Sequence, residues 1–195
     1  MKIVFIGAGN LATRLSLAMQ RVGMQIGQVY SHTEASARQL ATRLGCPWTN
    51  DLSALQEDGD LYVFSLKDTV LSDVISKVKP NNGMWVHTAG SMPMSVFEGY
   101  AQRFGVLYPL QTFSKGRNVN FDVIPIFLEA NTDKNADYLK NIASALSENV
   151  RFMSSEKRRS LHLAAVFACN FTNHIYTLSY KLRENESIPA DVLLP

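Results

Sequence analysis

The chain begins with a short apolar strand that leads directly into a glycine-rich turn and a helix. Residues 2–6 read Lys-Ile-Val-Phe-Ile, and the turn over residues 7–12 reads Gly-Ala-Gly-Asn-Leu-Ala. In folds that begin this way, the N-terminus of the helix faces a pyrophosphate. Gly7 would permit the tight exit from the strand, Gly9 would let the backbone approach the phosphates, and Ala12 would keep the helix close to the strand. We therefore predict a dinucleotide-binding turn rather than a βα turn without a ligand, with contacts from Gly7, Gly9, Asn10, Leu11 and Ala12.

Apolar runs bounded by turn residues alternate with helical periodicity along residues 1–153. The predicted strands lie near residues 2–7, 26–31, 60–66, 83–88, 103–108, 124–130 and 149–153, and Pro47-Trp48 could hold a short strand before a helical turn at Asp51 to Leu55. The clearest predicted helices cover residues 10–22, 34–44, 69–78 and 133–147. This βαβ rhythm predicts an α/β Rossmann fold with a doubly wound, mainly parallel sheet.

The character of the sequence changes after residue 153. Ser154-Ser155-Glu156 is typical of a helix cap, and residues 160–181 form one long apolar helical pattern with no strand signal. We predict a dinucleotide-binding domain over residues 1–153 and the start of an all-helical domain over residues 154–195. The long pattern has apolar residues on more than one side, of which the first domain can cover only one. We therefore expect a homodimer assembled through this helical part.

Charge and composition argue against several classes of protein. The 195 residues carry a formal net charge of +2, and 46% of them are hydrophobic, so a large core is expected and neither a nucleic acid nor an anionic membrane is suggested as a partner. No apolar run is long enough to span a bilayer, and the apolar N-terminus fits a strand better than a signal peptide, which predicts a cytoplasmic protein. Cys46 and Cys169 belong to no metal-binding spacing, so we expect reduced thiols and no metal site. The basic run Lys157-Arg158-Arg159 fits a solvated face, with recruitment of a phosphate or carboxylate as the alternative.

Ligands of an open α/β sheet bind beyond the carboxyl ends of its strands, and Ser31-His32-Thr33 follows the second strand. An NAD-preferring fold usually places an acidic residue there to bind the ribose 2′-hydroxyl. Glu34 instead falls in the first turn of the next helix, where it would complement the helix dipole. Two hydroxyls, an imidazole and nearby Arg38 suit a 2′-phosphate, although solvated turn residues would look the same. We predict NADP as the cofactor, with NAD less favoured, and contacts from Ser31, His32 and Thr33.

Polar residues also follow the next two strands that we place along the chain. After the first of them, Ser65 and Lys67 would lie near the cofactor, with Lys67 beside the nicotinamide ribose, and Asp68 would be a helix N-cap. After the second, Gly90 and Ser91 would offer backbone donors and a hydroxyl at the centre of the crevice. We predict that Ser65, Lys67 and Gly90 bind the cofactor.

A loop without periodicity follows the sixth strand. The strand ends in Tyr108-Pro109-Leu110-Gln111-Thr112-Phe113, and the loop extends to Asn120. Structureless loops of this length in compact α/β domains are often functional. Lys115 and Arg117 within it could meet an anionic substrate, although solvation is the simpler account. Upstream, His87 fits a hydrogen-bonded core histidine as well as a catalytic one.

Four segments together carry a resemblance to a known family: residues 7–12, 87–91, 108–113 and 161–171. They resemble the bacterial family of NADP oxidoreductases of unassigned substrate, which joins a Rossmann domain to a helical domain of unknown function. That family is related to pyrroline-5-carboxylate reductase, deazaflavin-dependent NADP reductase, prephenate dehydrogenase and the 6-phosphogluconate dehydrogenase superfamily. The resemblance covers nearly the whole chain and implies an active site in the interdomain cleft and dimerisation through the helical domain. The chain departs from the family in its shorter helical part and in His32, where an arginine would bind a 2′-phosphate more strongly.

A polar stripe runs along the long helical pattern. At about 100° per residue, Asn173 projects about 20° from His162 and Asn170 about 80° from it. In related dehydrogenases the first helix of the second domain contacts the substrate, so the resemblance implies His162, Asn170 and Asn173 as site residues; satisfying buried partners is the alternative. Histidine titrates near neutral pH, which makes His162 the best proton donor or acceptor by type. Ser91, Tyr108 and Asn173 would orient the substrate.

The sequence therefore predicts an NADP-dependent oxidoreductase. It would transfer hydride between C4 of the nicotinamide and the carbon of a small C=O or C=N substrate in the interdomain cleft. The predicted catalytic residues are His162, Asn173, Ser91 and Tyr108. The alternative is a non-catalytic NADP-binding sensor or scaffold protein, which could dispense with these polar groups. A deazaflavin or flavin could also take the place of a small substrate.

Overall fold

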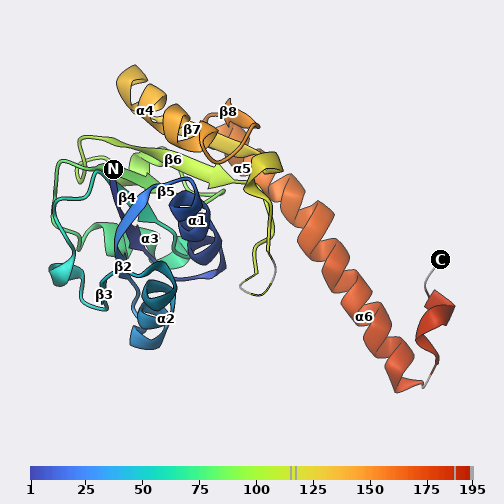
Figure 1. Cartoon of the computed structure of the whole chain (residues 1–195). Helices are drawn as coiled ribbons and strands as arrows, with labels where there is room; N and C mark the ends of the chain where they lie inside the picture. Colours follow the sequence, from blue (N-terminus) through green and yellow to red (C-terminus); the bar gives the residue numbers. More distant parts are fainter. Residues whose placement is uncertain (115, 117, 187, 194–195) are drawn as a thin grey trace.

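The chain folds around one eight-stranded sheet with the strand order β3-β2-β1-β4-β5-β6-β7-β8 (Figure 1). The computed structural model describes residues 1–114, 116, 118–186 and 188–193. The strands are β1 Lys2–Ile6, β2 Gln25–Tyr30, β3 Trp48–Thr49, β4 Leu61–Phe64, β5 Met84–His87, β6 Phe104–Pro109, β7 Ile126–Ala130 and β8 Val150–Phe152. The helices are α1 Asn10–Arg21, α2 Glu34–Leu44, α3 Asp68–Ile75, α4 Asp133–Ser144, α5 Ser155–Ala165 and α6 Thr172–Asn185. Short 3-10 turns lie at Leu52–Ala54, Met94–Phe97, Phe121–Val123 and Ala190–Leu193.

The predicted fold class is confirmed: this is a Rossmann-type, mainly parallel sheet followed by a helical region. The order of the first six strands is that of the doubly wound dinucleotide-binding fold. Every predicted strand is present, and Trp48–Thr49 forms the short additional one. The central strands lie between helices on both faces, which explains their continuous apolar runs; residues 3–6 of β1 are fully buried.

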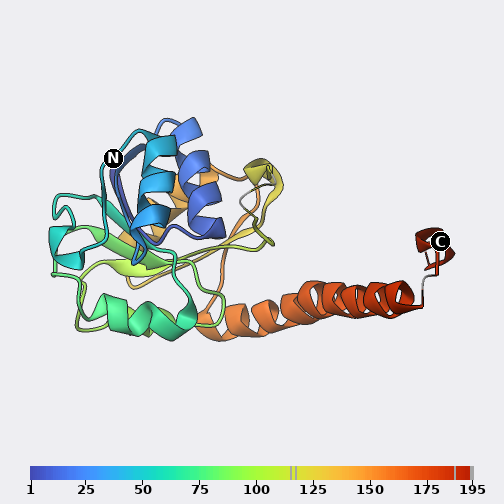
Figure 2. The same cartoon turned by 90° about the horizontal axis from the view of Figure 1, so that it is seen from below.

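Helices cover both faces of the sheet (Figure 2). On one face α1, α2 and α4 pack over a core that includes Leu15, Leu40 and Leu139. On the other face α3 and the turn Met94–Phe97 pack over a second core that includes Trp85. Leu161 of α5 extends this second layer over Val106, Tyr108 and Phe127, which belong to β6 and β7.

The exit from β1 shows why a glycine is needed at residue 7. Gly7 has a φ of +120°, and a Cβ there would overlap the carbonyl oxygen of Ser65, the residue that follows β4. Its N–H donates a hydrogen bond to the carbonyl oxygen of Tyr30 at the end of β2 (2.8 Å). Gly7 therefore lets the ends of three neighbouring strands meet at one point of the ligand-binding edge.

Strand β7 reverses the direction of the sheet. It is antiparallel to β6, with Ile126 opposite Pro109 and Ala130 opposite Gly105. β8 is parallel to β7 and therefore also runs away from the edge where β1, β4, β5 and β6 end. Helix α5 begins after β8, with Ser154 as its N-cap, as predicted. The division of the chain into domains at residues 153 and 154 remains a prediction.

The long helix predicted over residues 160–181 is present, but it is not α-helical throughout. A π-helical segment, Val166–Phe171, joins α5 to α6. In a π-helix each hydrogen bond spans one residue more than in an α-helix, so the expected angular spacing does not hold across the segment. Beyond it, α6 extends away from the sheet, and its side chains are mostly exposed (Figures 1 and 2). Within the described residues, no helix is both long enough and apolar enough to cross a membrane.

Candidate active site

The N-terminus of α1 is suited to an anionic ligand. Its N-cap, Gly9, provides no side-chain hydrogen bond, and of the described helices α1–α5 it alone has no acidic residue in its first turn. The partial positive charge of the helix end is therefore left without a protein counter-charge. A Cβ at Gly9 would meet no atom within 4 Å, so the space beside its backbone is open. By contrast Ala12 is fully buried, and its contribution is the close packing of α1 on the sheet.

The predicted 2′-phosphate residues lie next to this turn, at the end of β2. His32 and Thr33 are exposed and Ser31 is half-buried. Thr33 is the N-cap of α2, but its side chain makes no capping hydrogen bond. Glu34 lies in the first turn of α2, as predicted. The end of β2 thus places exposed hydroxyl and imidazole groups beside the glycine turn, without an acidic residue on the strand itself.

Contacts continue along the ligand-binding edge to β4 and β5. The hydroxyl of Thr88 donates a hydrogen bond to Ser65 Oγ (3.3 Å), and the hydroxyl of Ser91 donates one to the carboxylate of Asp68. The prediction that Asp68 caps α3 is wrong: Lys67 is the N-cap residue and Asp68 is the first residue of the helix. Its carboxylate therefore holds Ser91 rather than the helix N-terminus.

His162 reaches this edge from α5 and packs directly on Gly90. A Cβ at Gly90 would lie 2.5 Å from both Cγ and Nδ1 of the His162 ring. Gly90 is itself buried, so it has a packing role beside the cofactor contact predicted for it. The sequence could not indicate this role, because the two residues are far apart along the chain.

The His162 ring also contacts Tyr108 at the end of β6. The Tyr108 hydroxyl and His162 Nδ1 share a hydrogen bond of 2.8 Å, and the two rings meet edge to face. Burial raises the pKa of Tyr108 to about 12, outweighing the opposing effect of the Arg158 charge, so its phenol stays protonated. His87 lies in the core with Nε2 near the Pro93 carbonyl oxygen (3.3 Å), and burial, together with the Arg158 charge, lowers its pKa to about 4. The core interpretation of His87 is the one that fits these contacts.

A cavity of about 310 Å³ lies between the end of β6 and the helix. Its lining residues come from the strand end, α5 and the π-helical segment: Tyr108, Leu110, Gln111, Thr112, His162, Ala165, Val166, Ala168, Cys169 and Asn170. None of these is a lysine, arginine, aspartate or glutamate. Asn170 lines the cavity, whereas Asn173 is exposed outside it, because the polar stripe was projected with α-helical spacing across a π-helical segment. Such segments occur frequently at functional sites.

The loop after β6 is attached to the first helix. Asn10 Nδ2 donates a hydrogen bond to the Phe113 carbonyl oxygen (3.1 Å), and Arg14 Nε donates one to that of Ser114 (2.9 Å). The almost fully buried Arg14 was missed by the sequence analysis, since nothing in a helical pattern indicates a partner about 100 residues away. Lys115 and Arg117, the proposed anion contacts, lie outside the described residues.

The interpretation of Lys157-Arg158-Arg159 as a solvated face is wrong for its central residue. Arg158 is fully buried and forms an ion pair with Glu129 (2.6 Å). Burial alone would raise the pKa of Glu129, but hydrogen bonds from Ser155 and Arg158 outweigh it and hold that pKa below its usual value. A detectable signal was present, because Glu129 stands within a strand that is otherwise apolar and so required a partner.

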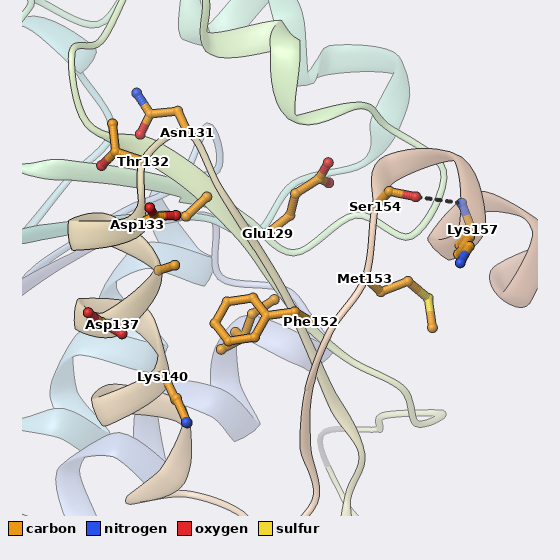
Figure 3. A pocket seen from close by; sticks show the side chains of 13 residues that line it. Glu129, Asn131, Thr132, Asp133, Asp137, Lys140, Phe152, Met153, Ser154 and Lys157 are labelled. Atoms are coloured by element: carbon orange, nitrogen blue, oxygen red, sulfur yellow. Dashed lines mark hydrogen bonds between the residues drawn. The ribbon is translucent and has the colours of Figure 1, made fainter.

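A larger and more open hollow, of about 770 Å³, lies at the opposite edge of the sheet, between the end of β7 and the starts of α4 and α5 (Figure 3). Thr132 and Ser154, which line it, accept hydrogen bonds from Asn135 N and Lys157 N and so cap the two helices. None of the predicted site residues lines this hollow.

Both cysteines, Cys46 and Cys169, are free, and the described part of the chain holds no group of three or more His, Cys, Asp or Glu residues arranged for a metal ion.

Comparisons with known proteins divide the chain into two matched regions. Residues 2–86 match the family model described as NADP oxidoreductase coenzyme F420-dependent, and residues 124–195 match a domain of unknown function. The second match therefore begins before β7, inside the sheet. The curated proteins include no match to the chain.

Several solved structures share the fold. A Bacteroides fragilis protein provisionally named an NADP oxidoreductase is 49% identical, with a TM-score of 0.90, and the match covers 100% of this chain and 76% of that one. A Thermotoga maritima protein is 23% identical, with a TM-score of 0.75 and coverage of 92% and 69%. An imine reductase from Myxococcus stipitatus in complex with NADP+ is 15% identical, with a TM-score of 0.70 and coverage of 98% and 68%. The last two similarities establish the fold alone.

Proposed function

The chain belongs to the family of NADP oxidoreductases that combine a Rossmann-type domain with this domain of unknown function, and we propose that it transfers hydride between NADP(H) and the carbon of a small C=O or C=N substrate. The observation that carries the proposal is the position of His162. Its ring packs on Gly90 at the strand-end edge where the glycine turn also lies, and it lines a cavity large enough for a small molecule.

The ends of four strands provide the binding edge. The open backbone at Gly9 and the uncapped N-terminus of α1 would hold the pyrophosphate, and Ser31, His32 and Thr33 the 2′-phosphate. Ser65 and Lys67, after β4, would contact the ribose on the nicotinamide side. When bound, the nicotinamide supplies or accepts the hydride at C4.

His162 would exchange the proton that accompanies this hydride. Its Nδ1 is occupied by the bond to Tyr108, so Nε2 is the nitrogen left for the substrate. In the protonated ring, Nδ1–H donates to the Tyr108 oxygen and Nε2–H donates to the substrate oxygen or nitrogen. After proton transfer the ring keeps Nδ1–H and its bond to Tyr108. Tyr108 fixes the ring without losing its own proton, because its pKa is about 12.

Asn170 takes the orienting role that the sequence analysis gave to Asn173. Its amide lies in the cavity lining, on the π-helical segment that follows α5. Ser91, held by Asp68 and one residue after Gly90, would orient the substrate from the β5 side.

A substrate screen tests the proposed function. We expect NADPH oxidation, followed by absorbance, with small imines or ketones. The screen includes a deazaflavin as an alternative hydride acceptor. Tight NADPH binding with no turnover of any acceptor would instead favour the sensor.

Cofactor preference is a separate prediction. Because β2 ends in hydroxyl and imidazole groups rather than an acid, NADPH should bind about tenfold or more tightly than NADH, a difference of ~1.4 kcal/mol or more. Titration of nicotinamide fluorescence measures both affinities. His32→Ala should reduce the ratio, while Arg43→Ala, near the end of α2, should not. Equal affinities in the wild type would remove the argument from the β2 residues.

The assembly is a further prediction. Exposed apolar side chains continue from the π-helical segment along α6: Phe167, Phe171, Ile175, Tyr176, Leu178 and Leu182. We expect a second copy of the chain to cover them, so that sedimentation at micromolar concentration gives a dimer. Ile175→Glu should shift the equilibrium toward monomer, and Val123→Glu, an exposed apolar position on a loop of the sheet domain, should not. A stable wild-type monomer would contradict the prediction.

A further inference from the structure

Arg158 joins three segments of the chain at the start of α5. Its side chain is fully buried, and Nη1 donates a hydrogen bond to the Glu129 carboxylate in β7 (2.6 Å). Nη2 donates to the Met92 carbonyl oxygen in the loop after β5 (2.6 Å) and to Ser155 Oγ in α5 (3.1 Å). The planar guanidinium can reach these directions at once, which a lysine ammonium on a flexible stem cannot do in the same geometry.

Ser155 closes the same network. Its hydroxyl donates a hydrogen bond to the Glu129 carboxylate (2.6 Å) and accepts one from Met94 N (2.9 Å). Two backbone groups of the loop after β5, at Met92 and Met94, are therefore held by the first turn of α5. The loop and the helix are fixed to each other and to β7 at this point.

The reacting histidine lies one helical turn further along. His162 follows Arg158 by four residues, so both project from the same side of α5. Gly90, the residue on which the His162 ring packs, lies two residues before Met92 in the same loop. The helix and the loop are thus in contact twice, once through the Arg158 network and once through the His162 ring. A shift of α5 at the first contact is therefore expected to move the second.

We propose that Arg158 is a positioning residue for His162. It holds α5 on the loop after β5 so that the imidazole stays over Gly90 with Nδ1 in hydrogen-bond contact with Tyr108. This leaves Nε2 directed at the substrate. The inference rests on the proposed function for its catalytic meaning, but the geometry it describes can be measured without a substrate.

The first experiment measures the His162 ring itself. In protein labelled with ¹⁵N-histidine and assigned with His162→Ala, we expect the neutral ring of the wild type in the Nδ1–H form. Arg158→Lys should convert it to a mixture of both tautomers, while NADPH affinity stays within about twofold. Arg159→Lys is the matched control, because Arg159 is the exposed neighbour on the same helix and should leave the His162 resonances unchanged.

Kinetics then separate positioning from general stability. Arg158→Lys should lower kcat roughly tenfold in the wild type, and should lower it little further in a His162→Ala background, because the two residues act through one ring. A purely structural role would reduce kcat equally in both backgrounds. If Arg158→Lys does not fold, Ser155→Ala, which removes one hydroxyl of the same network, should alter the tautomer in the same direction.

Unchanged His162 resonances and unchanged kcat in both variants would overturn the inference. A wild type without turnover would defeat the proposed function instead, and the tautomer of His162 in Arg158→Lys would still decide whether Arg158 positions the ring.

Discussion

Replacing His162 with alanine should lower the turnover number for reduction by roughly 10²-fold or more and leave the affinity for NADPH nearly unchanged. The reason is the separation of roles along the binding edge. In the proposed function His162 would exchange the proton, whereas the glycine turn and the end of β2 would hold the phosphates. Steady-state kinetics and fluorescence titration measure the two quantities independently.

His174→Ala provides the matched control, since His174 is exposed on α6 and does not line the cavity. Tyr108→Phe should reduce turnover less than His162→Ala, because the His162 ring then loses the hydrogen bond that orients it but keeps its ability to transfer a proton. If His162→Ala reduces the substrate as fast as the wild type does, the proton comes from another group. The assignment would then move to Ser91 and Tyr108.

Gly9→Asp should weaken NADPH binding by roughly tenfold or more without lowering the stability of the fold. A carboxylate there would stand against the pyrophosphate at the N-terminus of α1 and repel it. The backbone at Gly9 has a φ of −75°, which any residue can adopt, and a Cβ meets no atom within 4 Å. Fluorescence titration and thermal unfolding measure the two effects.

Gly7→Ala is the opposite case and serves as the comparison. Its φ of +120° and the overlap of its Cβ with the Ser65 carbonyl oxygen should destabilise the fold by about 1–3 kcal/mol. The two substitutions in this turn are thus expected to differ: Gly9→Asp lowers the affinity for NADPH, and Gly7→Ala lowers the stability of the fold. A large drop in the melting temperature of Gly9→Asp would show that this turn has no spare room at residue 9.

The sheet could be predicted because its signals are local. The strands stand out as apolar runs, since burial on both faces leaves little place for polar residues, and the β1 run of residues 3–6 is fully buried. Gly7 was predictable for the same reason: a tight exit from a strand is a property of a few consecutive residues. Ser154 was recognisable as a helix cap from its neighbours alone.

Two features that the sequence did not reveal are contacts between distant parts of the chain. Arg158 resembled a solvated charge, because its partner Glu129 lies 29 residues earlier, in a strand. The packing of Gly90 on His162 cannot be read from either segment. Asn173 was chosen over Asn170 because a periodicity of 3.6 residues was assumed across a π-helical segment that no local composition announces.

The reversed direction of β7 determines which part of each helix faces the crevice. Because β7 and β8 run toward the far edge, α5 begins there beside Glu129 and reaches the crevice only at His162, after about 10 Å of helix. Helix α1, by contrast, points its N-terminal end at the crevice, where the available groups are backbone N–H groups that do not depend on side chains. Helix α5 passes the crevice side-on, so it contributes only side chains, such as His162, to it. Substitutions on α5 could accordingly change the reaction without changing how the N-terminus of α1 binds a dinucleotide.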